Sequence, residues 1–221
     1  MITKSNEIKH FLPETVVALS DIPLLLQLMT VCPLPDLEVE SLLTKIRYES
    51  LLSITSLSYT SESLNFYLAL ALQCFTNEYI YPQTDLESQR LQEIDGTVGD
   101  ALAKGQQPEV LVLLCLASYK PLSQYPWYQL LVFPQSLKVL AQRQIWDVTE
   151  ELTLKASIPT LQDIKNDISL KVQTQYEHHP YPRWVNLSCP VESRTIPKIV
   201  SDLSLKVSDL NASHYNTLDV L

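Results

Sequence analysis

One stretch decides the fold of this 221-residue chain: residues 61–79, which read SESLNFYLALALQCFTNEY. Ser61 and Ser63 supply hydroxyl side chains of the kind that favour a helix start. From Leu64 to Tyr79, apolar residues occupy nearly every side of the predicted helix. A helix that is apolar all round has no face suited to water and therefore lies inside a core. We predict that the other elements pack around it.

The composition is that of a folded protein. Hydrophobic residues make up 46% of the chain and charged residues 19%, which is unlike the composition of disordered proteins. A chain of this length buries about 70% of the surface that its unfolded form exposes. We therefore expect a sizeable core.

The charge pattern narrows the classes of partner. The net charge of −9 is spread along the chain, and the 16 Lys and Arg residues form no basic run. Neither nucleic acid nor an anionic membrane surface is an expected partner. Apolar runs such as Val110–Ala117 are far shorter than the ~20 residues of a membrane span. Residues 1–7 lack the features of a secretory signal, so we predict a cytoplasmic protein.

The cysteines predict no disulfide framework and no metal site. They lie far apart without a CxxC pair, and buried free thiols are expected: Cys32, Cys74, Cys115 and Cys189. The adjacent His178 and His179 are poorly placed to bind one ion with Cys189, and no fourth ligand has suitable spacing. The sequence gives no support to a Cys-His nucleophile built on Cys74 or Cys115.

Capping signals predict helices on both sides of the central one. Asp21 is placed to cap a short helix that has Pro23 in its first turn. Asp36 opens a longer helix with an acidic first turn. Thr84 and Glu87 have the spacing of a capping box and precede an amphipathic pattern.

The helical pattern continues in the second half of the chain. Gly105 is a stop signal for the capping-box helix. Glu109–Ser118 fits a buried strand or a helix, and the proline at its start favours the helix. Three prolines make Tyr119–Pro134 an irregular connection with short turns. Two more helices are marked by apolar spacing within Leu137–Leu152 and Leu161–Tyr176.

These segments predict a mainly α fold, a helical bundle or solenoid of about seven helices in residues 1–175. Residues 176–214 are expected to form a linker with one short helix, Ile196–Leu205. In residues 215–221, the run Leu218–Leu221 looks like the first strand of an α/β Rossmann-like domain that is cut off at this point. A strand needs neighbouring strands to pair with, and the sequence predicts no other strand for this run.

The most specific motif is QYEHHPYPRW, residues Gln175–Trp184. It resembles a signature of the form YExxPYPRW in a bacterial family of class I S-adenosylmethionine-dependent methyltransferases that carry a helical N-terminal extension. Two other stretches, Ala71–Tyr79 and Ser118–Leu122, are similar to parts of the same extension. Together the resemblance covers most of residues 40–221.

The resemblance implies S-adenosyl-L-methionine as the cofactor of the intact family enzyme, held by a glycine-rich loop after a strand like Leu218–Leu221. The residues themselves argue that this loop is missing here. A tight turn close to a cofactor requires glycine, and the glycines Gly96, Gly99 and Gly105 all fall on one predicted helix or its end. We therefore expect no cofactor, no catalytic residue and no methyl transfer in this chain alone.

The linker motif holds the candidate site residues Tyr181, Arg183 and Trp184. Arg183 is expected either to contact a substrate carboxylate or the methionyl end of the cofactor, or to pair with an acid such as Glu177. Tyr181 and Trp184 either line the same cleft or anchor the hinge. Asn77-Glu78, at the end of the central helix, either faces a binding groove or caps a neighbouring helix.

Two functions follow as hypotheses. The first is a methyltransferase's N-terminal domain that covers or selects an unidentified methyl acceptor, with the catalytic domain absent from this chain. The alternative is a freestanding helical interaction module that binds a protein or peptide in a groove and has no enzymatic activity.

Overall fold

The computed structural model describes residues 12–56, 59–159 and 166–178. All of them belong to one compact unit, Met1–Val185, while a second unit, Asn186–Leu221, lies outside the described residues. Every regular element in the described part is helical, which confirms the mainly α prediction. The predicted strand at Leu218–Leu221 and the helix at Ile196–Leu205 fall outside it. The larger helices are α2 (Pro23–Val31), α3 (Leu37–Ser53), α4 (Ser61–Thr76), α5 (Asp85–Ala103), α6 (Val110–Ala117), α8 (Asp147–Ser157) and α9 (Asp167–His178).

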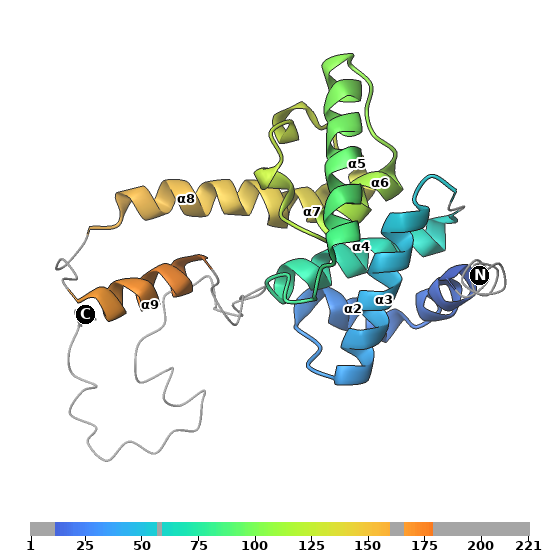
Figure 1. Cartoon of the computed structure of the whole chain (residues 1–221), viewed down its shortest axis with the longest axis horizontal. Helices are drawn as coiled ribbons and strands as arrows, with labels where there is room; N and C mark the ends of the chain where they lie inside the picture. Colours follow the sequence, from blue (N-terminus) through green and yellow to red (C-terminus); the bar gives the residue numbers. More distant parts are fainter. Residues whose placement is uncertain (1–11, 57–58, 160–165, 179–221) are drawn as a thin grey trace, which may run out of the picture. The chain divides into compact units, whose positions relative to one another are not determined.

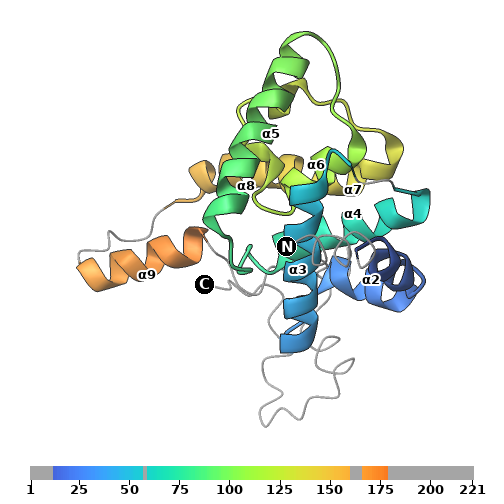
Figure 2. The same cartoon turned by 45° about the vertical axis from the view of Figure 1, so that its right-hand side comes forward.

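The central helix lies where the sequence predicts it. α4 packs against α2 on one side and α6 on the other (Figure 1), and α3 contacts α5 and α6 (Figure 2). A capping box starts α4: Ser63 N donates to the Thr60 hydroxyl, and Thr60 N donates to Ser63 Oγ at 2.8 Å. The buried residues of α4 lie on nearly every side of the helix: Ser63, Phe66, Tyr67, Ala69, Leu70, Ala71, Leu72, Gln73, Cys74, Phe75 and Thr76.

The capping predictions are confirmed at two of three positions. Asp36 accepts hydrogen bonds from the amides of Glu38 and Val39 at 3.0 Å. Thr84 and Glu87 form the predicted capping box at the start of α5. The prediction for Asp21 is wrong, because the N-cap of α2 is Ile22 and no side chain caps it. Asp21 N donates to Val17 O, so this residue closes the preceding helical turn instead of opening the next one.

The ambiguous apolar run forms a helix. α6 is buried along most of its length, and its proline start and helical neighbours favoured this outcome. The following connection consists of the short 3-10 turns η1 (Leu122–Gln124) and η2 (Tyr128–Leu130), as the prolines predict.

The predicted long helix contains an irregularity that the apolar spacing did not indicate. It runs through η3 (Gln135–Leu137), α7 (Lys138–Ala141), a π-helical turn η4 (Gln142–Trp146) and α8. A π turn inserts one extra residue without removing the helical periodicity on either side, so pattern reasoning passes over it. α9 begins at Asp167, later than predicted, and residues 160–165 lie outside the described part.

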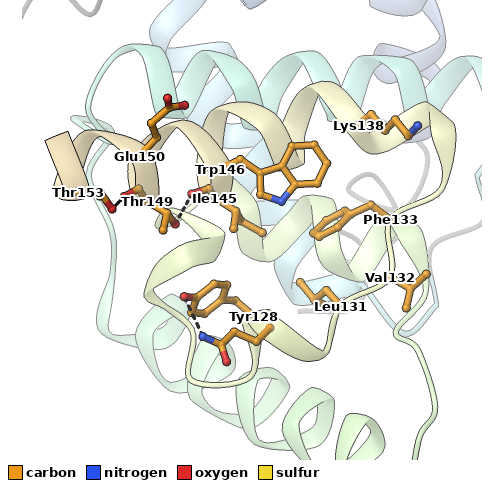
Figure 3. Close-up of a pocket in the computed structure, with 11 residues that line it drawn as sticks. Tyr128, Leu131, Val132, Phe133, Lys138, Ile145, Trp146, Thr149, Glu150 and Thr153 are labelled. Carbon is orange, nitrogen blue, oxygen red and sulfur yellow. Dashed lines mark hydrogen bonds between the residues drawn. The ribbon is translucent and has the colours of Figure 1, made fainter.

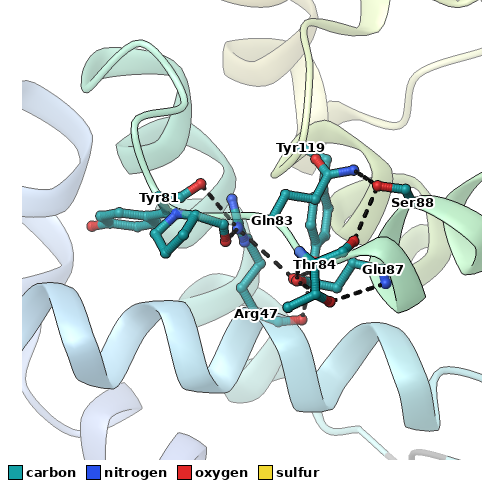
Figure 4. A network of polar contacts seen from close by, with 8 residues as sticks. Arg47, Tyr81, Gln83, Thr84, Glu87, Ser88 and Tyr119 are labelled. Atoms are coloured by element: carbon teal, nitrogen blue, oxygen red, sulfur yellow. Dashed lines mark hydrogen bonds and ion pairs between the residues drawn. The ribbon is translucent and has the colours of Figure 1, made fainter.

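A buried arginine joins α3 to the connection between α4 and α5 (Figure 4). Arg47 is only 2% exposed. Its Nη2 donates to the carbonyl oxygens of Pro82 at 2.7 Å and Tyr81 at 3.3 Å. Its guanidinium carbon lies 4.3 Å from the centre of the Tyr119 ring. A charge removed from water requires such compensation.

Glu87 supplies the opposite charge, 3.8 Å from Arg47 Nη2, and is itself 1% exposed. The same carboxylate accepts hydrogen bonds from Thr84 N at 2.7 Å and from the Tyr119 hydroxyl at 2.7 Å. Burial and this bond to Glu87 raise the pKa of Tyr119 far above its usual value, so the phenol remains a donor. One side chain thus caps α5, balances Arg47 and fixes the start of the connection after α6.

No single helix in the described ranges has the length and apolar composition needed to cross a membrane. Residues 12–20 and Pro23–Val31 meet that composition only when taken together, and these two helices are bent by 89°. By length and composition alone, such a pair is weak evidence for a broken span.

Replacing Glu87 with alanine leaves Arg47 buried without its counter-charge and removes the cap of α5. We expect the free energy of unfolding to fall by about 3–5 kcal/mol, measured by urea denaturation. Glu93→Ala is the matched control, because Glu93 pairs with Arg90 at 2.8 Å on the exposed side of the same helix. Its removal should cost less than about 1 kcal/mol. Equal losses in the two variants would contradict the role of the buried pair.

Candidate functional site

A cavity of about 700 Å³ lies beside the C-terminal end of α4. We call it the α4 cavity. It is formed by the α2–α3 connection, α3, the end of α4 and the end of α9. Its lining residues are Pro33, Leu34, Pro35, Glu40, Gln73, Asn77, Glu78, Ile80, Gln175 and Tyr176.

The backbone at the edge of this cavity is strained. Asn77 ends α4, and its side-chain oxygen accepts a hydrogen bond from Tyr79 N at 3.2 Å. The next two residues, Glu78 and Tyr79, have φ values of 59° and 56°. This left-handed conformation costs non-glycine residues about 1–2 kcal/mol each, and such strain concentrates at functional sites. Asn77 therefore lines the cavity, one of the two roles expected of it, and it ends its own helix α4 instead of capping a neighbouring one.

Two stretches that carry the family resemblance meet at the α4 cavity. Asn77 and Glu78 come from the stretch Ala71–Tyr79, and Gln175 and Tyr176 begin the linker motif. These segments are far apart in sequence, so their proximity is a property of the fold. The third stretch, Ser118–Leu122, forms a turn whose residues Ser118, Tyr119 and Leu122 are buried.

The candidate residues Tyr181, Arg183 and Trp184 lie outside the described residues. Glu177, the acid considered as a partner for Arg183, forms an ion pair with Lys155 at 2.6 Å. Gln173 also donates to this carboxylate at 2.6 Å.

The α4 cavity has the chemistry of a binding site. Glu40 and Glu78 supply carboxylate acceptors, and Leu34, Ile80 and Tyr176 supply apolar walls. The described lining contains no serine, cysteine or histidine that would act as a nucleophile or proton carrier. The carboxylates suit a ligand that has a hydrogen-bond donor or a positive charge.

The buried thiols are unsuited to catalysis. Cys74 and Cys115 are free and buried, as predicted, and burial raises the pKa of each to about 12. Cys32 is free but partly exposed, so the prediction of burial is wrong there, and Cys189 lies outside the described residues. Within the described ranges, no group of three or more His, Cys, Asp or Glu side chains is placed to hold a metal ion.

A second cavity was not anticipated from the sequence. This Trp146 groove, of about 860 Å³, lies between the η2 connection and the π turn with α8 (Figure 3). The wall formed by the η2 connection was predicted only as an irregular connection, because of its prolines. The aromatic residues of that segment are a signal that could have indicated a groove. Its lining residues are Tyr128, Gln129, Leu131, Val132, Phe133, Lys138, Ile145, Trp146, Thr149, Glu150 and Thr153.

The π turn anchors this groove to the core. Gln144 is fully buried and accepts a hydrogen bond from Leu122 N at 3.2 Å, while its amide nitrogen donates to Ala117 O at 3.1 Å. These are the free backbone groups of a helix start and a helix end, which need side-chain partners when buried. Arg143 donates to the Thr76 hydroxyl at 2.8 Å and to Thr30 O. Because adjacent residues of the turn reach inward, Trp146 is left facing the groove.

The buried thiols give a test of the core. At pH 8, a pKa of about 12 leaves only about 0.01% of each thiol as the reactive thiolate. We expect iodoacetamide to label Cys32 in the folded protein, and Cys74 and Cys115 only after unfolding in urea, as mapped by peptide mass spectrometry. Labelling of either buried thiol in the folded state would contradict the packing. Because these pKa values lie above those of unfolded thiols, stability should also fall as pH rises from about 9 to 12.

Comparison with known proteins identifies no relative of this chain. No model of a protein family matches this chain, and no curated protein or solved structure matches it. The methyltransferase assignment therefore remains a prediction that rests on the motif residues.

Proposed function

We propose that this helical domain covers and selects the methyl acceptor of an S-adenosylmethionine-dependent methyltransferase. The observation that carries the proposal is the α4 cavity. Two stretches chosen from the sequence for their resemblance to one methyltransferase family line the same cavity, and strained backbone forms its edge.

The glycines support a division of labour between this domain and a separate cofactor-binding domain. Gly96 and Gly99 lie inside α5, and a Cβ at Gly99 would lie 3.3 Å from Trp127 Cδ1. Gly105 follows the end of α5 with φ +75°, as a helix stop requires. These roles in and after one helix leave no glycine-rich loop in the chain, so the proposed S-adenosyl-L-methionine site belongs to residues beyond it.

The proposed contribution of the domain is positioning. Methyl transfer by in-line displacement depends on aligning the acceptor with the methyl group and on excluding water. A cavity with apolar walls and the carboxylates of Glu40 and Glu78 is suited to orient a polar acceptor. The acceptor itself is not specified by these residues.

Calorimetric titration with S-adenosyl-L-methionine tests the division of labour. We expect binding to the full-length product of the gene and none to residues 1–221. Tight binding to residues 1–221 would mean that this domain itself holds the cofactor, which contradicts the proposal.

Variants at the α4 cavity test its role in acceptor selection. In the full-length protein, Tyr176→Ala and Glu78→Gln should lower kcat/KM for the acceptor about tenfold or more, with the Kd for S-adenosyl-L-methionine unchanged. Transfer of a labelled methyl group measures the first quantity and calorimetry the second. Ile168→Ala is the control, because Ile168 lies on α9, is exposed and does not line the cavity. A changed cofactor Kd with normal acceptor kinetics would contradict the proposal.

A helical interaction module without enzymatic activity is the second candidate. The exposed apolar side chains of α8 and α9 favour it, since such residues are typical of surfaces that bind another protein. They are Leu152 and Leu154 on α8, Ile158 directly after it, and Ile168, Leu170, Val172 and Tyr176 on α9. Absence of both methyl transfer and cofactor binding in the full-length protein would leave this candidate as the better explanation.

A further inference from the structure

One wall of the α4 cavity differs from the others in how it is attached. α9 contributes Gln175 and Tyr176 to the lining. Every described side chain of this helix, from Asp167 to Glu177, is exposed. The apolar ones are no exception, since Ile168 is 73% and Tyr176 is 65% exposed. A helix is held against a domain by burying an apolar face, and the described side chains of α9 bury none.

The walls formed by α4 and by the connection between α2 and α3 are tied together. Gln73 is fully buried, and Asn77 is 3% exposed. With its amide turned to suit its neighbours, Gln73 donates to Met29 O at 2.9 Å and accepts from Leu34 N at 3.0 Å. Because Leu34 is itself a lining residue, this contact fixes two walls of the cavity to each other. α9 is the weakly attached wall.

Local hydrogen bonds maintain α9 as a helix. The side-chain oxygen of Asn166 accepts hydrogen bonds from the amides of Ile168 at 2.9 Å and Ser169 at 3.2 Å, which caps the first turn. Near the other end, Gln173 donates to Glu177 at 2.6 Å. These bonds do not depend on the rest of the domain, so α9 is able to move as one unit.

An ion pair connects α9 to α8. Lys155 Nζ lies 2.6 Å from Glu177 Oε2, and the two side chains are 58% and 36% exposed. An exposed pair of this kind changes an equilibrium by about fivefold or less, and salt screens it. Segments with few buried apolar contacts open at low cost in free energy. An attachment of this size leaves both attached and detached positions of a helix populated.

We propose that α9 is a movable wall of the α4 cavity, that the Lys155–Glu177 ion pair favours its closed position, and that a bound methyl acceptor favours that position further. The last part rests on the proposed function of the cavity. Tyr176 places an aromatic ring at the cavity, and this ring is mostly exposed in the free chain. A ligand that covers the ring adds apolar contact between α9 and the other walls, so its binding shifts α9 to the closed position.

Amide hydrogen exchange of the 221-residue chain, followed by mass spectrometry, tests the movable wall without a ligand. We expect the amides of α9 to exchange at least about 100-fold faster than those of the buried α4, because α9 opens locally whereas α4 opens only with the core. Exchange in α9 as slow as in α4 would overturn the proposal, because it would mean that α9 is stably packed.

Lys155→Gln tests the ion pair without changing any residue of α9. We expect exchange in α9 to become about two- to fivefold faster, because the closed position is weakened. Glu151→Gln is the matched control, since Glu151 is exposed on the same helix. Each single charge reversal, Lys155→Glu or Glu177→Lys, should also speed exchange, and the two reversals together should restore it. Equal rates in Lys155→Gln and Glu151→Gln would overturn the proposal.

A thiol in the lining tests whether movement of α9 opens the cavity. In a Cys32→Ser background, Leu34→Cys places this thiol on one of the fixed walls. We expect iodoacetamide to label it about two- to fivefold faster in combination with Lys155→Gln than with Glu151→Gln. Thermal unfolding establishes that each variant is folded. Equal labelling rates in the two combinations would overturn the proposal.

Acceptor kinetics of the full-length protein separate this proposal from the proposed function. Lys155→Gln should raise KM for the acceptor about two- to fivefold, with kcat and the Kd for S-adenosyl-L-methionine unchanged. An unchanged KM would overturn closure by the acceptor. Absence of methyl transfer would instead contradict the proposed function, and hydrogen exchange and thiol labelling would still decide whether α9 is a movable wall.

Discussion

The buried pair of Arg47 and Glu87 is the constraint on which the rest of the domain depends. Each charge is removed from water, so each must be compensated by fixed neighbours. Arg47 holds the carbonyl oxygens of Tyr81 and Pro82, and Glu87 holds the Tyr119 hydroxyl. The pair thereby fixes α3, the start of α5 and the end of α6 together. It also fixes the connection that includes the strained edge of the α4 cavity.

The π turn makes a second junction, between the core and the later helices. Gln144 satisfies backbone groups at the end of α6 and the start of η1, and Arg143 reaches the ends of α2 and α4. An inserted residue of this kind changes which side chains face inward. The consequence is an exposed Trp146 on a rigid support. The groove therefore depends on the helix irregularity as well as on the η2 connection that forms its other wall.

The two cavities share one structural feature, an irregular backbone segment in their wall. In each, an irregular backbone segment at a helix places side chains in the cavity lining. Neighbouring residues of the same segment form hydrogen bonds within the fold. At the α4 cavity the irregular segment is the left-handed turn at Glu78 and Tyr79, and at the groove it is the π turn. Both sites have carboxylates among their lining residues, in keeping with the acidic chain.

The sequence by itself determined the features that depend on near neighbours in the chain. The caps at Asp36 and Thr84 and the stop at Gly105 follow from contacts between residues two to four apart, and the burial of α4 follows from its apolar composition. Tertiary structure alone decided that Arg47 is buried, because in the sequence it is one charged residue in a helix whose partners are 34 to 72 positions away. It also decided the π turn and the shared cavity that is lined by the end of α4 and by Gln175 and Tyr176 of α9. These depend on how complete helices pack, and no local pattern records that packing.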